Sequence, residues 1–313
     1  MTEDDPHRVR LPHTRRAVPA GPKVRLDSPP QPRHGAGVES HHRRAVLAAL
    51  ALGVLIALLG VGRVQAAEPA RWAPDPTDSW QYQLSGRIDT TVDADVFDID
   101  AFSTRREVVA ALHDAGKRAV CYVDAGSWEP YRPDADRFPA AVIGKPVDGW
   151  PDERWLDIRR LDVLRPILRD RIERCAAKGF DGVEFDWTDG YLQDTGFDLG
   201  RADQLRFDRW LARAAHANGL AVGLKNALPL IRALVDDYDF AVNEQCFQYQ
   251  ECGRYAPFSS AGKAVFNVEY SLPRASFCDR AVAIGIMAIR KHLELDAWRR
   301  ACPEPATAPP TGA

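Results

Sequence analysis

Two acidic residues near the middle of the chain have the types and the spacing of a catalytic group. Glu184 and Asp186 alternate with the apolar residues Val183 and Phe185. Because successive side chains of a strand point to opposite faces, the two acids share one face of the expected strand, with Asp186 nearer to its C-terminal end. Carboxyl groups at such a position can transfer protons or attack a substrate. The alternative is a loop that carries solvated acids.

Polar residues also end most of the other apolar runs. We predict strands over 80–84, 96–100, 119–124, 182–186, 221–226, 240–244, 264–269 and 284–289. Their C-terminal ends carry Gln83, Asp100, Asp124, Asp186, Lys225, Asn226, Glu244, Glu269, Tyr270 and Arg290. Like charges that gather in a cleft raise one another's pKa, so a cluster of acids indicates a function or a cationic partner.

Helical periodicity separates most of these strands. Apolar residues from Leu164 to Cys175 recur on one face and stop before Gly179, and a second stripe from Phe207 to Ala215 stops before Asn218. Alternating strands and helices indicate parallel β-α-β units, and eight such units in about 230 residues fit a (β/α)8 TIM barrel. A doubly wound open sheet is the alternative. The sequence has no glycine-rich phosphate loop after a strand, which argues against that alternative.

In a TIM barrel the C-terminal strand ends converge on the face that carries the active site. Aromatic residues in the expected loops, such as Trp128, Tyr131 and Tyr191, are suited to present a ring face to a sugar. The predicted substrate-binding residues are Asp100, Asp124, Trp128, Tyr131, Trp187, Asp189, Tyr191, Lys225, Asn226, Glu269 and Tyr270.

The N-terminal part of the chain differs in composition from the rest. Residues 1–44 are rich in Pro, Arg and His and predict a disordered basic tail. Residues 45–62 form an uncharged apolar block after the basic flank at 41–44, long enough for a marginal membrane span. Residues 64–66 resemble a signal-peptidase site. The block is therefore either a cleaved signal peptide or an anchor in the membrane, and both place the folded part outside the cytoplasm, secreted or on the outer face of the membrane.

Charge follows the same division. We expect a linker over 63–79, a folded domain over 80–303 and a disordered C-terminal tail over 304–313. Residues 1–44 contain nine Lys and Arg against five Asp and Glu, a net charge of +4, whereas the remainder of the chain has a net charge of −7, for a total of −3. An acidic domain argues against nucleic acid as a partner and is compatible with a cationic ligand.

All six cysteines lie in the expected domain, and an even number in an exported protein indicates disulfides. Six cysteines allow fifteen complete pairings. A short loop favours one pair, and a second pair would fix the C-terminal end of the domain. The pairing that we favour joins Cys246 to Cys252, Cys278 to Cys302 and Cys121 to Cys175.

The residue types favour hydrolysis of a glycosidic bond. The domain has no Cys-x-x-Cys pair, and its histidines fall on helix-like segments, so we predict no metal and no cofactor. Glycoside hydrolysis requires one carboxyl group that protonates the leaving oxygen and a second that attacks or activates water. Asp186 and Glu244 end the fourth and sixth expected strands and are the best pair. Asp100, Asp124 and Glu269 are possible substitutes.

Six short motifs carry a resemblance to a known family. They lie at 121–129, 131–134, 155–159, 182–186, 223–227 and 243–247 and read CYVDAGSWE, YRPD, WLDIR, GVEFD, GLKNA and NEQCF. Together and in this order they resemble glycoside hydrolase family 114, over a region from about residue 80 to residue 270.

The resemblance implies a (β/α)8 barrel with endo-α-1,4-polygalactosaminidase activity, a retaining mechanism and a cationic aminosugar polysaccharide as the partner. It implies Asp186 and Glu244 as the catalytic pair, which we interpret as nucleophile and acid/base. Phe185 and Trp187 replace a Pro and an Asn that are frequent in the family, and Asp124 replaces a small Ser. These differences adjoin the expected −1 subsite and bear on the exact polymer and its N-acetylation. The alternative function is a catalytically silent carbohydrate-binding barrel on the cell surface.

Overall fold

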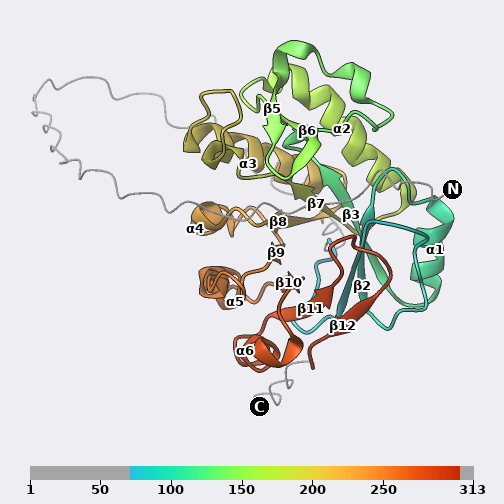
Figure 1. Cartoon of the computed structure of the whole chain (residues 1–313). Helices are drawn as coiled ribbons and strands as arrows, with labels where there is room; N and C mark the ends of the chain where they lie inside the picture. Colours follow the sequence, from blue (N-terminus) through green and yellow to red (C-terminus); the bar gives the residue numbers. More distant parts are fainter. Residues whose placement is uncertain (1–70, 304–313) are drawn as a thin grey trace, which may run out of the picture. The chain divides into compact units, whose positions relative to one another are not determined.

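Nine strands form one sheet in the part of the chain that the computed structural model describes, residues 71–303 (Figure 1). Eight strands run parallel, each beside the next along the chain. They are β1 (Trp80–Gln83), β2 (Val96–Asp100), β3 (Arg118–Asp124), β7 (Gly182–Asp186), β8 (Ala221–Lys225), β9 (Phe240–Glu244), β10 (Val265–Glu269) and β11 (Met287–Lys291). The ninth strand, β12 (Arg299–Ala301), is antiparallel to β11.

Side-chain hydrogen bonds join the first and last parallel strands. The indole Nε1 of Trp80 donates to the carbonyl oxygen of Met287 at 2.9 Å, and Lys291 Nζ donates to Gln81 Oε1 at 3.0 Å. The sheet is therefore a nearly closed barrel of the TIM type. The eight predicted strands are present and run parallel in chain order, and β12 is a ninth strand of the sheet that we did not predict.

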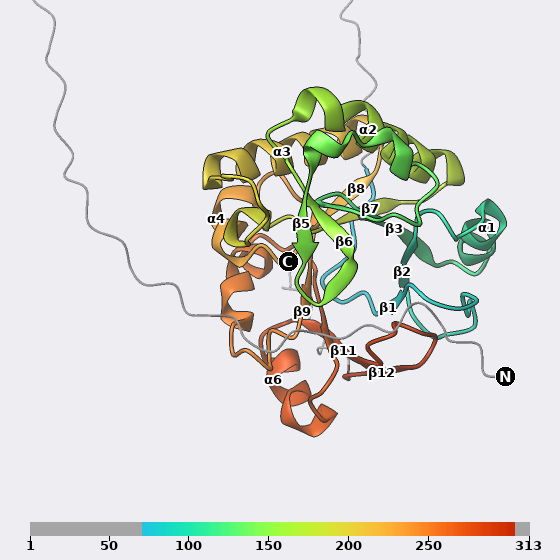
Figure 2. The same cartoon turned by 45° about the horizontal axis from the view of Figure 1, so that its top comes forward.

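The helices lie around the outside of the sheet (Figures 1 and 2). They are α1 (Arg106–Asp114), α2 (Leu161–Lys178), α3 (Arg201–Ala217), α4 (Ile231–Leu234), α5 (Ala256–Ser260) and α6 (Cys278–Ala283). The (β/α)8 prediction is thus incomplete in its helices, because β1 and β2 are joined by a loop and α4 to α6 are short. The stripe from Leu164 to Cys175 is buried as predicted, and α2 is capped by Gly179, whose φ of 90° a residue with a side chain rarely adopts.

A second, three-stranded antiparallel sheet is inserted between β3 and α2. It contains β4 (Ser127–Trp128), β5 (Ile143–Val147) and β6 (Trp150–Leu156) in the order β4-β6-β5. The β5–β6 hairpin crosses in front of the barrel in Figure 2. Our sequence analysis did not predict this sheet. The strand predicted over 284–289 also began too early, because Ile284 caps the C-terminal end of α6 and Gly285, with φ of 67°, makes the turn into β11.

Apolar side chains pack on both sides of the barrel sheet. Inside the barrel, Trp80 stacks on Phe266 with ring centroids 5.0 Å apart, next to Val96 on β2. Outside it, Phe97 and Ile99 of β2 belong to the core that the helices cover. The alternation along β2 therefore divides its residues between the two cores.

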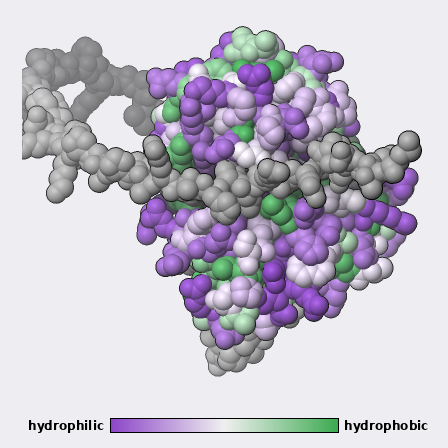
Figure 3. Space-filling view, in the orientation of Figure 1, coloured by the Kyte–Doolittle hydropathy of each residue, from purple (hydrophilic) through white to green (hydrophobic). Residues whose placement is uncertain are grey.

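The surface between these elements is mainly polar. Hydrophilic side chains predominate on the face shown in Figure 3, with apolar side chains scattered among them. In the described part of the chain the large hydrophobic side chains that stand exposed are Tyr131, Leu192, Tyr249 and Ile284.

Three disulfides link the described cysteines, and their pairing is the one that we favoured. They join Cys121 to Cys175, Cys246 to Cys252 and Cys278 to Cys302. The predicted tail over 1–44, the apolar block over 45–62, the first part of the linker (63–70) and the C-terminal tail over 304–313 lie outside the described residues. Within residues 71–303, every helix is too short or too polar to cross a membrane.

Candidate active site

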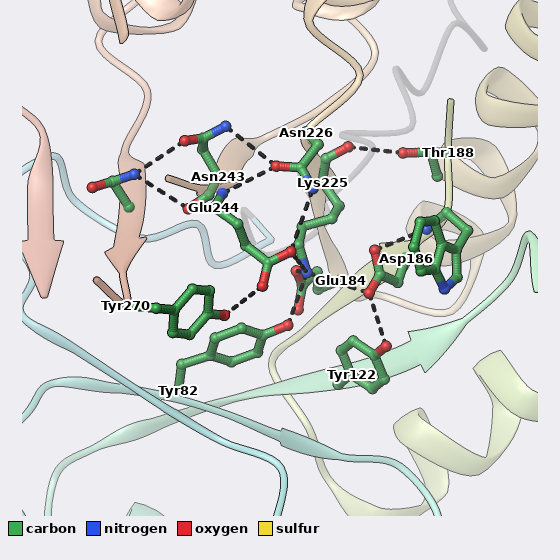
Figure 4. A network of polar contacts seen from close by, with 12 residues as sticks. Tyr82, Tyr122, Glu184, Asp186, Thr188, Lys225, Asn226, Asn243, Glu244 and Tyr270 are labelled. Atoms are coloured by element: carbon green, nitrogen blue, oxygen red, sulfur yellow. Dashed lines mark hydrogen bonds and ion pairs between the residues drawn. The ribbon is translucent and has the colours of Figure 1, made fainter. Parts of the chain in front are cut away.

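Lys225, the last residue of β8, lies among polar side chains at the C-terminal ends of the strands (Figure 4). Its Nζ is 2.8 Å from Glu184 Oε1, 3.4 Å from Asp186 Oδ2 and 3.7 Å from Glu244 Oε2. It also donates a 2.8 Å hydrogen bond to the hydroxyl of Tyr82. Burial by itself lowers the pKa of Lys225, but Asp186, Glu184 and Glu244 outweigh it and raise that pKa well above its usual value. The lysine therefore stays charged and links β8 to acids on both neighbouring strands.

Asp186, which ends β7, has a donor on each carboxylate oxygen. The hydroxyl of Tyr122 donates to Oδ2 at 2.8 Å, and the backbone N–H of Trp187 donates to Oδ1 at 2.8 Å. Lys225 provides a further contact to Oδ2 at 3.4 Å. The side chain remains 15% exposed. The carboxylate is thus held in one orientation with a part of its surface open.

Glu244, which ends β9, is held from two sides. The hydroxyl of Tyr270 donates to Oε1, and Asn226 Nδ2 donates to Oε2 at 3.5 Å. Asn226 also accepts the backbone N–H of Glu244 through Oδ1 at 3.0 Å. The side chain of Glu244 is 29% exposed, whereas that of Glu184 is 0% exposed. Of the three acids around Lys225, Asp186 and Glu244 are therefore the two that a ligand can reach.

A buried carboxyl pair, Asp98 and Glu184, adjoins this group. The two carboxyl groups interact with each other in the buried interior of the barrel, where two ionised carboxylates would repel each other. Burial, and after it the charge of Glu184, raises the pKa of Asp98 well above its usual value. Burial also raises the pKa of Glu184, but Lys225 opposes that rise. We conclude that Asp98 carries the proton and that Glu184 is the ionised partner of Lys225.

The backbone is left-handed directly after three adjacent strands. Trp187, Asn226 and Gln245 follow β7, β8 and β9 and have φ of 59°, 48° and 64°. Each such residue other than glycine costs about 1–3 kcal/mol, and such residues cluster at active sites and ligand clamps. The repeated turn places the side chains of Asp186, Lys225–Asn226 and Glu244 around one opening.

A second acidic group lies beside the first. Among the described residues, carboxylate oxygens of Asp124, Glu129 and Glu153 lie within 4.8 Å of one another, which is close enough to hold a cation. Arg132 pairs with Glu129 at 2.6 Å, and Ser127 Oγ contacts both Asp124 and Glu153. Burial, followed by the charge of Glu129, raises the pKa of Asp124 well above its usual value and that of Glu153 to about 7. Because these groups have protein partners, we describe them as a hydrogen-bonded network and assign no ion to them.

Three acids that we predicted to bind substrate are buried. Asp100 pairs with Arg132 at 2.5 Å and is 5% exposed, while Asp124 is 1% exposed. Glu269 is 0% exposed and accepts the backbone N–H of Phe247 at 2.9 Å, and its burial raises its pKa to about 7. Asp100 and Asp124 hold the loops after their own strands, and Glu269 holds the loop after β9, so the predicted direct contact with substrate has no support in their placement.

Tyr131 and Tyr191 lie in connections between the strands and helices as expected, whereas Trp128 belongs to β4, and only Tyr131 is strongly exposed. Tyr131 is 53% exposed, and its hydroxyl donates to Glu129 at 2.7 Å. Trp128 is half-buried and donates to a backbone carbonyl at 3.1 Å. Tyr191 and Asp189 are half-buried, and Tyr191 packs against the outer core. Tyr131 is therefore the side chain of this set most accessible to a ligand.

Sequence reasoning missed several members of the site. Tyr122 and Asp98 lie two residues before the acids that end their strands, as Glu184 lies two residues before Asp186, so the alternation places them on the same face as those acids. That signal was available and was applied only to Glu184. Glu153 belongs to the unpredicted sheet, for which the charged and proline-rich sequence gave no strand signal.

Comparison with known proteins assigns the family. A sequence model of the glycoside-hydrolase family GH114 matches residues 62–307. The chain belongs to this family. As a member of GH114 it is a glycosidase, and the prediction of an enzyme of this family from the six motifs is confirmed.

Two solved structures and one sequence relative are similar to this GH114 protein. The structure of Aspergillus fumigatus Ega3 in complex with galactosamine is 39% identical, covers 75% of this chain and 98% of its own, and superposes with a TM-score of 0.71. The glycoside hydrolase domain of PelA from Pseudomonas aeruginosa is 16% identical, covers 71% of this chain and 98% of its own with a TM-score of 0.60, and shows the same fold. An uncharacterized protein of Deinococcus radiodurans is 29% identical in an alignment of 256 positions that covers 69% of this chain and 81% of that protein.

Proposed function

We propose that the protein is an extracytoplasmic glycoside hydrolase that cleaves α-1,4-linked galactosamine polysaccharide internally by a retaining mechanism. Asp186 is the nucleophile and Glu244 is the acid/base. One observation carries the assignment: these two carboxyl groups end β7 and β9, contact the same buried lysine, and are the acids of that group with exposed surface. Two carboxyl groups that flank an opening are the requirement for glycoside hydrolysis.

The separation of the two acids favours retention. Lys225 Nζ lies 3.4 Å from Asp186 Oδ2 and 3.7 Å from Glu244 Oε2, so these two oxygens can be at most about 7.1 Å apart. Retaining enzymes place the two groups about 5–5.5 Å apart, whereas inverting enzymes leave about 6.5–9.5 Å for a water. The upper limit of about 7.1 Å allows the separation found in retaining enzymes and excludes most of the range found in inverting enzymes for Asp186 Oδ2 and Glu244 Oε2.

In the first step, Glu244 gives its proton to the glycosidic oxygen while Asp186 attacks the anomeric carbon, forming a glycosyl ester as the bond to the leaving sugar breaks. In the second step, Glu244 takes a proton from water, which attacks the same carbon and releases Asp186. Tyr122 and the Trp187 N–H aim the Asp186 carboxylate, and Tyr270 with Asn226 aims Glu244. Two displacements at one carbon retain its configuration.

Two observations support a cationic aminosugar as the substrate. Ega3, which shares 39% of its residues with this chain, was crystallised with galactosamine. The site also concentrates negative charge, because Glu184, Asp186 and Glu244 share one lysine. A protonated sugar amine is attracted to such a cleft.

Action inside the polymer requires room beyond the cleaved bond. A hollow of 590 Å³ lies beside the β5–β6 hairpin and is lined by Lys145, Pro146, Trp155 and Gln193 among others. Trp155 packs edge-on against Trp187 with ring centroids 5.0 Å apart, so the hollow adjoins the residue that follows Asp186. We propose that it holds sugar units of the chain next to the reacting one.

The disulfides support the proposed location. Three disulfides account for every described cysteine, and such bonds persist in oxidising compartments and are rare in the cytosol. Secretion or attachment to the outer face of the membrane through residues 45–62 remains a proposal from the sequence.

The decisive experiment measures new reducing ends after incubation with an α-1,4-galactosamine polymer. Asp186→Ala and Glu244→Ala should each lower the rate by several orders of magnitude. The control, Asp170→Asn, changes an acid on α2 that is 54% exposed and should act like the unmodified enzyme. Unmodified protein that binds the polymer without producing reducing ends would support the silent carbohydrate-binding barrel instead.

Azide distinguishes the roles of the two acids. In Asp186→Ala it should replace the nucleophile and give a glycosyl azide of inverted configuration. In Glu244→Ala it should intercept the glycosyl ester and give a product of retained configuration. Exchanged outcomes would reverse the two assignments.

A further inference from the structure

The backbone around the proposed nucleophile is clamped by the turn after β3. The backbone N–H groups of Ala125 and Gly126 both donate to the carbonyl oxygen of Asp186, at 3.3 and 3.2 Å. A Cβ on Gly126 would lie 2.0 Å from the carbonyl oxygen of Trp187. The turn therefore packs so closely against the backbone of Asp186 and Trp187 that only glycine fits at position 126. This contact holds Trp187 in its left-handed conformation.

The side chain of Trp187 is held by one strand of the inserted sheet. Its Nε1 donates to Glu153 Oε2 at 3.0 Å, and the ring of Trp155 packs against it at an interplanar angle of 77°. Glu153 and Trp155 both belong to β6 and are 7% and 3% exposed. The hairpin thus provides both the acceptor and one wall for the indole.

Asp124 and Glu153 are bridged by Ser127, and this arrangement requires a proton on one of the two carboxyl groups. Ser127 Oγ is hydrogen-bonded to both Asp124 Oδ2 and Glu153 Oε2, but a hydroxyl has only one hydrogen to donate. One contact must therefore run from a protonated carboxyl group to the serine oxygen. Glu153 Oε2 already accepts the indole N–H, and the pKa of Asp124 is raised well above its usual value by burial, so Asp124 is the protonated group. Ser127 then donates to Glu153.

We propose that Asp124, Ser127 and Glu153 form a hydrogen-bonded relay that positions the nucleophile through Trp187. Glu153 fixes the indole, and the backbone N–H of the same tryptophan fixes Oδ1 of Asp186. Glu153 is thus a positioning residue, separated from the reacting atoms by Trp187. This inference rests on the proposed function, because it concerns the orientation of the proposed nucleophile. A displacement of about 1 Å at a reacting group can cost about 100-fold in rate.

The kinetic arm compares variants at both ends of the Glu153–Trp187 bond. Glu153→Ala should lower kcat about 10- to 100-fold with a smaller change in KM. Glu153→Gln should lose far less, because its carboxamide oxygen accepts the same hydrogen bonds. Trp187→Phe removes the donor and should add little when it is combined with Glu153→Ala, because coupled residues are non-additive. The control is Asp152→Ala, an exposed acid on the same strand.

An arm without catalysis uses ¹⁵N-labelled protein. Trp187→Phe identifies the indole signal of Trp187, and Glu153→Ala should shift both this signal and the backbone amide signal of Trp187, while Asp152→Ala shifts neither. If Glu153→Ala does not fold, Trp187→Phe carries the kinetic arm. A kcat of Glu153→Ala equal to that of the unmodified enzyme overturns the inference and leaves the proposed function intact. If the unmodified enzyme cleaves no polymer, the proposed function fails, and an unshifted Trp187 backbone amide in Glu153→Ala overturns the positioning as well.

Discussion

Replacement of Lys225 by methionine tests whether one buried cation holds the site together. Its Nζ lies 2.8 Å from Glu184, 3.4 Å from Asp186 and 3.7 Å from Glu244, and its side chain is 1% exposed. Methionine keeps the length of the chain but leaves Glu184 as a buried charge without its partner. Removing one member of a buried ion pair costs about 3–5 kcal/mol. For a domain of this size, each kcal/mol lowers Tm by about 2–4 °C, so the expected decrease is roughly 6–20 °C.

The loss should depend on pH in a definite direction. Without Lys225, burial keeps the pKa of Glu184 in the folded protein above the value of about 4.3 in the unfolded chain. The folded state then binds the proton more tightly than the unfolded state, so stability falls as the pH rises through and above the unfolded pKa. Lys225→Met should therefore lose less stability at pH 4, where Glu184 is protonated in the folded state and mostly protonated in the unfolded chain, than at pH 7.

Thermal unfolding followed by circular dichroism at pH 4 and pH 7, with the disulfides intact, measures both effects. Lys145→Met is the matched control, because Lys145 pairs with Asp194 on the surface, with 54% and 82% of the side chains exposed. Such pairs contribute less than about 1 kcal/mol. A decrease in Tm for Lys225→Met no larger than that of the control at pH 7, or an equal decrease at both pH values, would refute the reasoning.

Three further predictions concern the buried acids, the substrate and the disulfides. The free energy of unfolding of Asp98→Asn should lie within about 1 kcal/mol of that of the unmodified protein, because the amide imitates the protonated acid, whereas Glu184→Gln should lower it by about 3–5 kcal/mol. Equal losses for the two variants in denaturant titrations would contradict the proton assignment. Affinity for a de-N-acetylated polymer should fall as salt rises, since the screening length shrinks from about 10 Å at 0.1 M to about 3 Å at 1 M, and affinity for the acetylated polymer should hardly change; parallel salt curves would rule out electrostatic selection. Replacing Cys121 and Cys175 by alanine should destabilise the protein about 2 kcal/mol more than replacing Cys246 and Cys252, because the closed loops span 54 and 6 residues, and equal midpoints in guanidinium would argue against this loop-entropy difference.

The barrel strands and their order followed from the sequence because their signals are local. Apolar runs end in polar residues, and period-two alternation sorts side chains to the two faces of a sheet. The same alternation predicted from the sequence that Glu184 and Asp186 share one face of their strand. The strand ends then implied one site, because parallel strands in a barrel end on a common face. The three disulfides were also correctly paired.

The connections were harder to predict. The β5–β6 hairpin contains Pro146 and Pro151 and carries exposed charges, so it lacks the alternation that identifies a strand, and its order comes from pairing within the inserted sheet. The loop in place of a first helix, and the shortness of α4 to α6, likewise depend on what each connection packs against. Local propensity carries little information on such contacts.

The sequence by itself determined which residue types stand at the strand ends, and hence the family and its class of chemistry. Tertiary structure decided which of these residues are open and which are buried. Asp100, Asp124 and Glu269 occupy strand ends as Asp186 and Glu244 do, yet they are buried in hydrogen bonds, Asp100 and Asp124 with the loops that follow their own strands and Glu269 with the loop after β9. The physical reason is that the exposure and partners of a carboxyl group depend on residues far away in sequence, as Lys225 shows by meeting acids from β7 and β9 at one point.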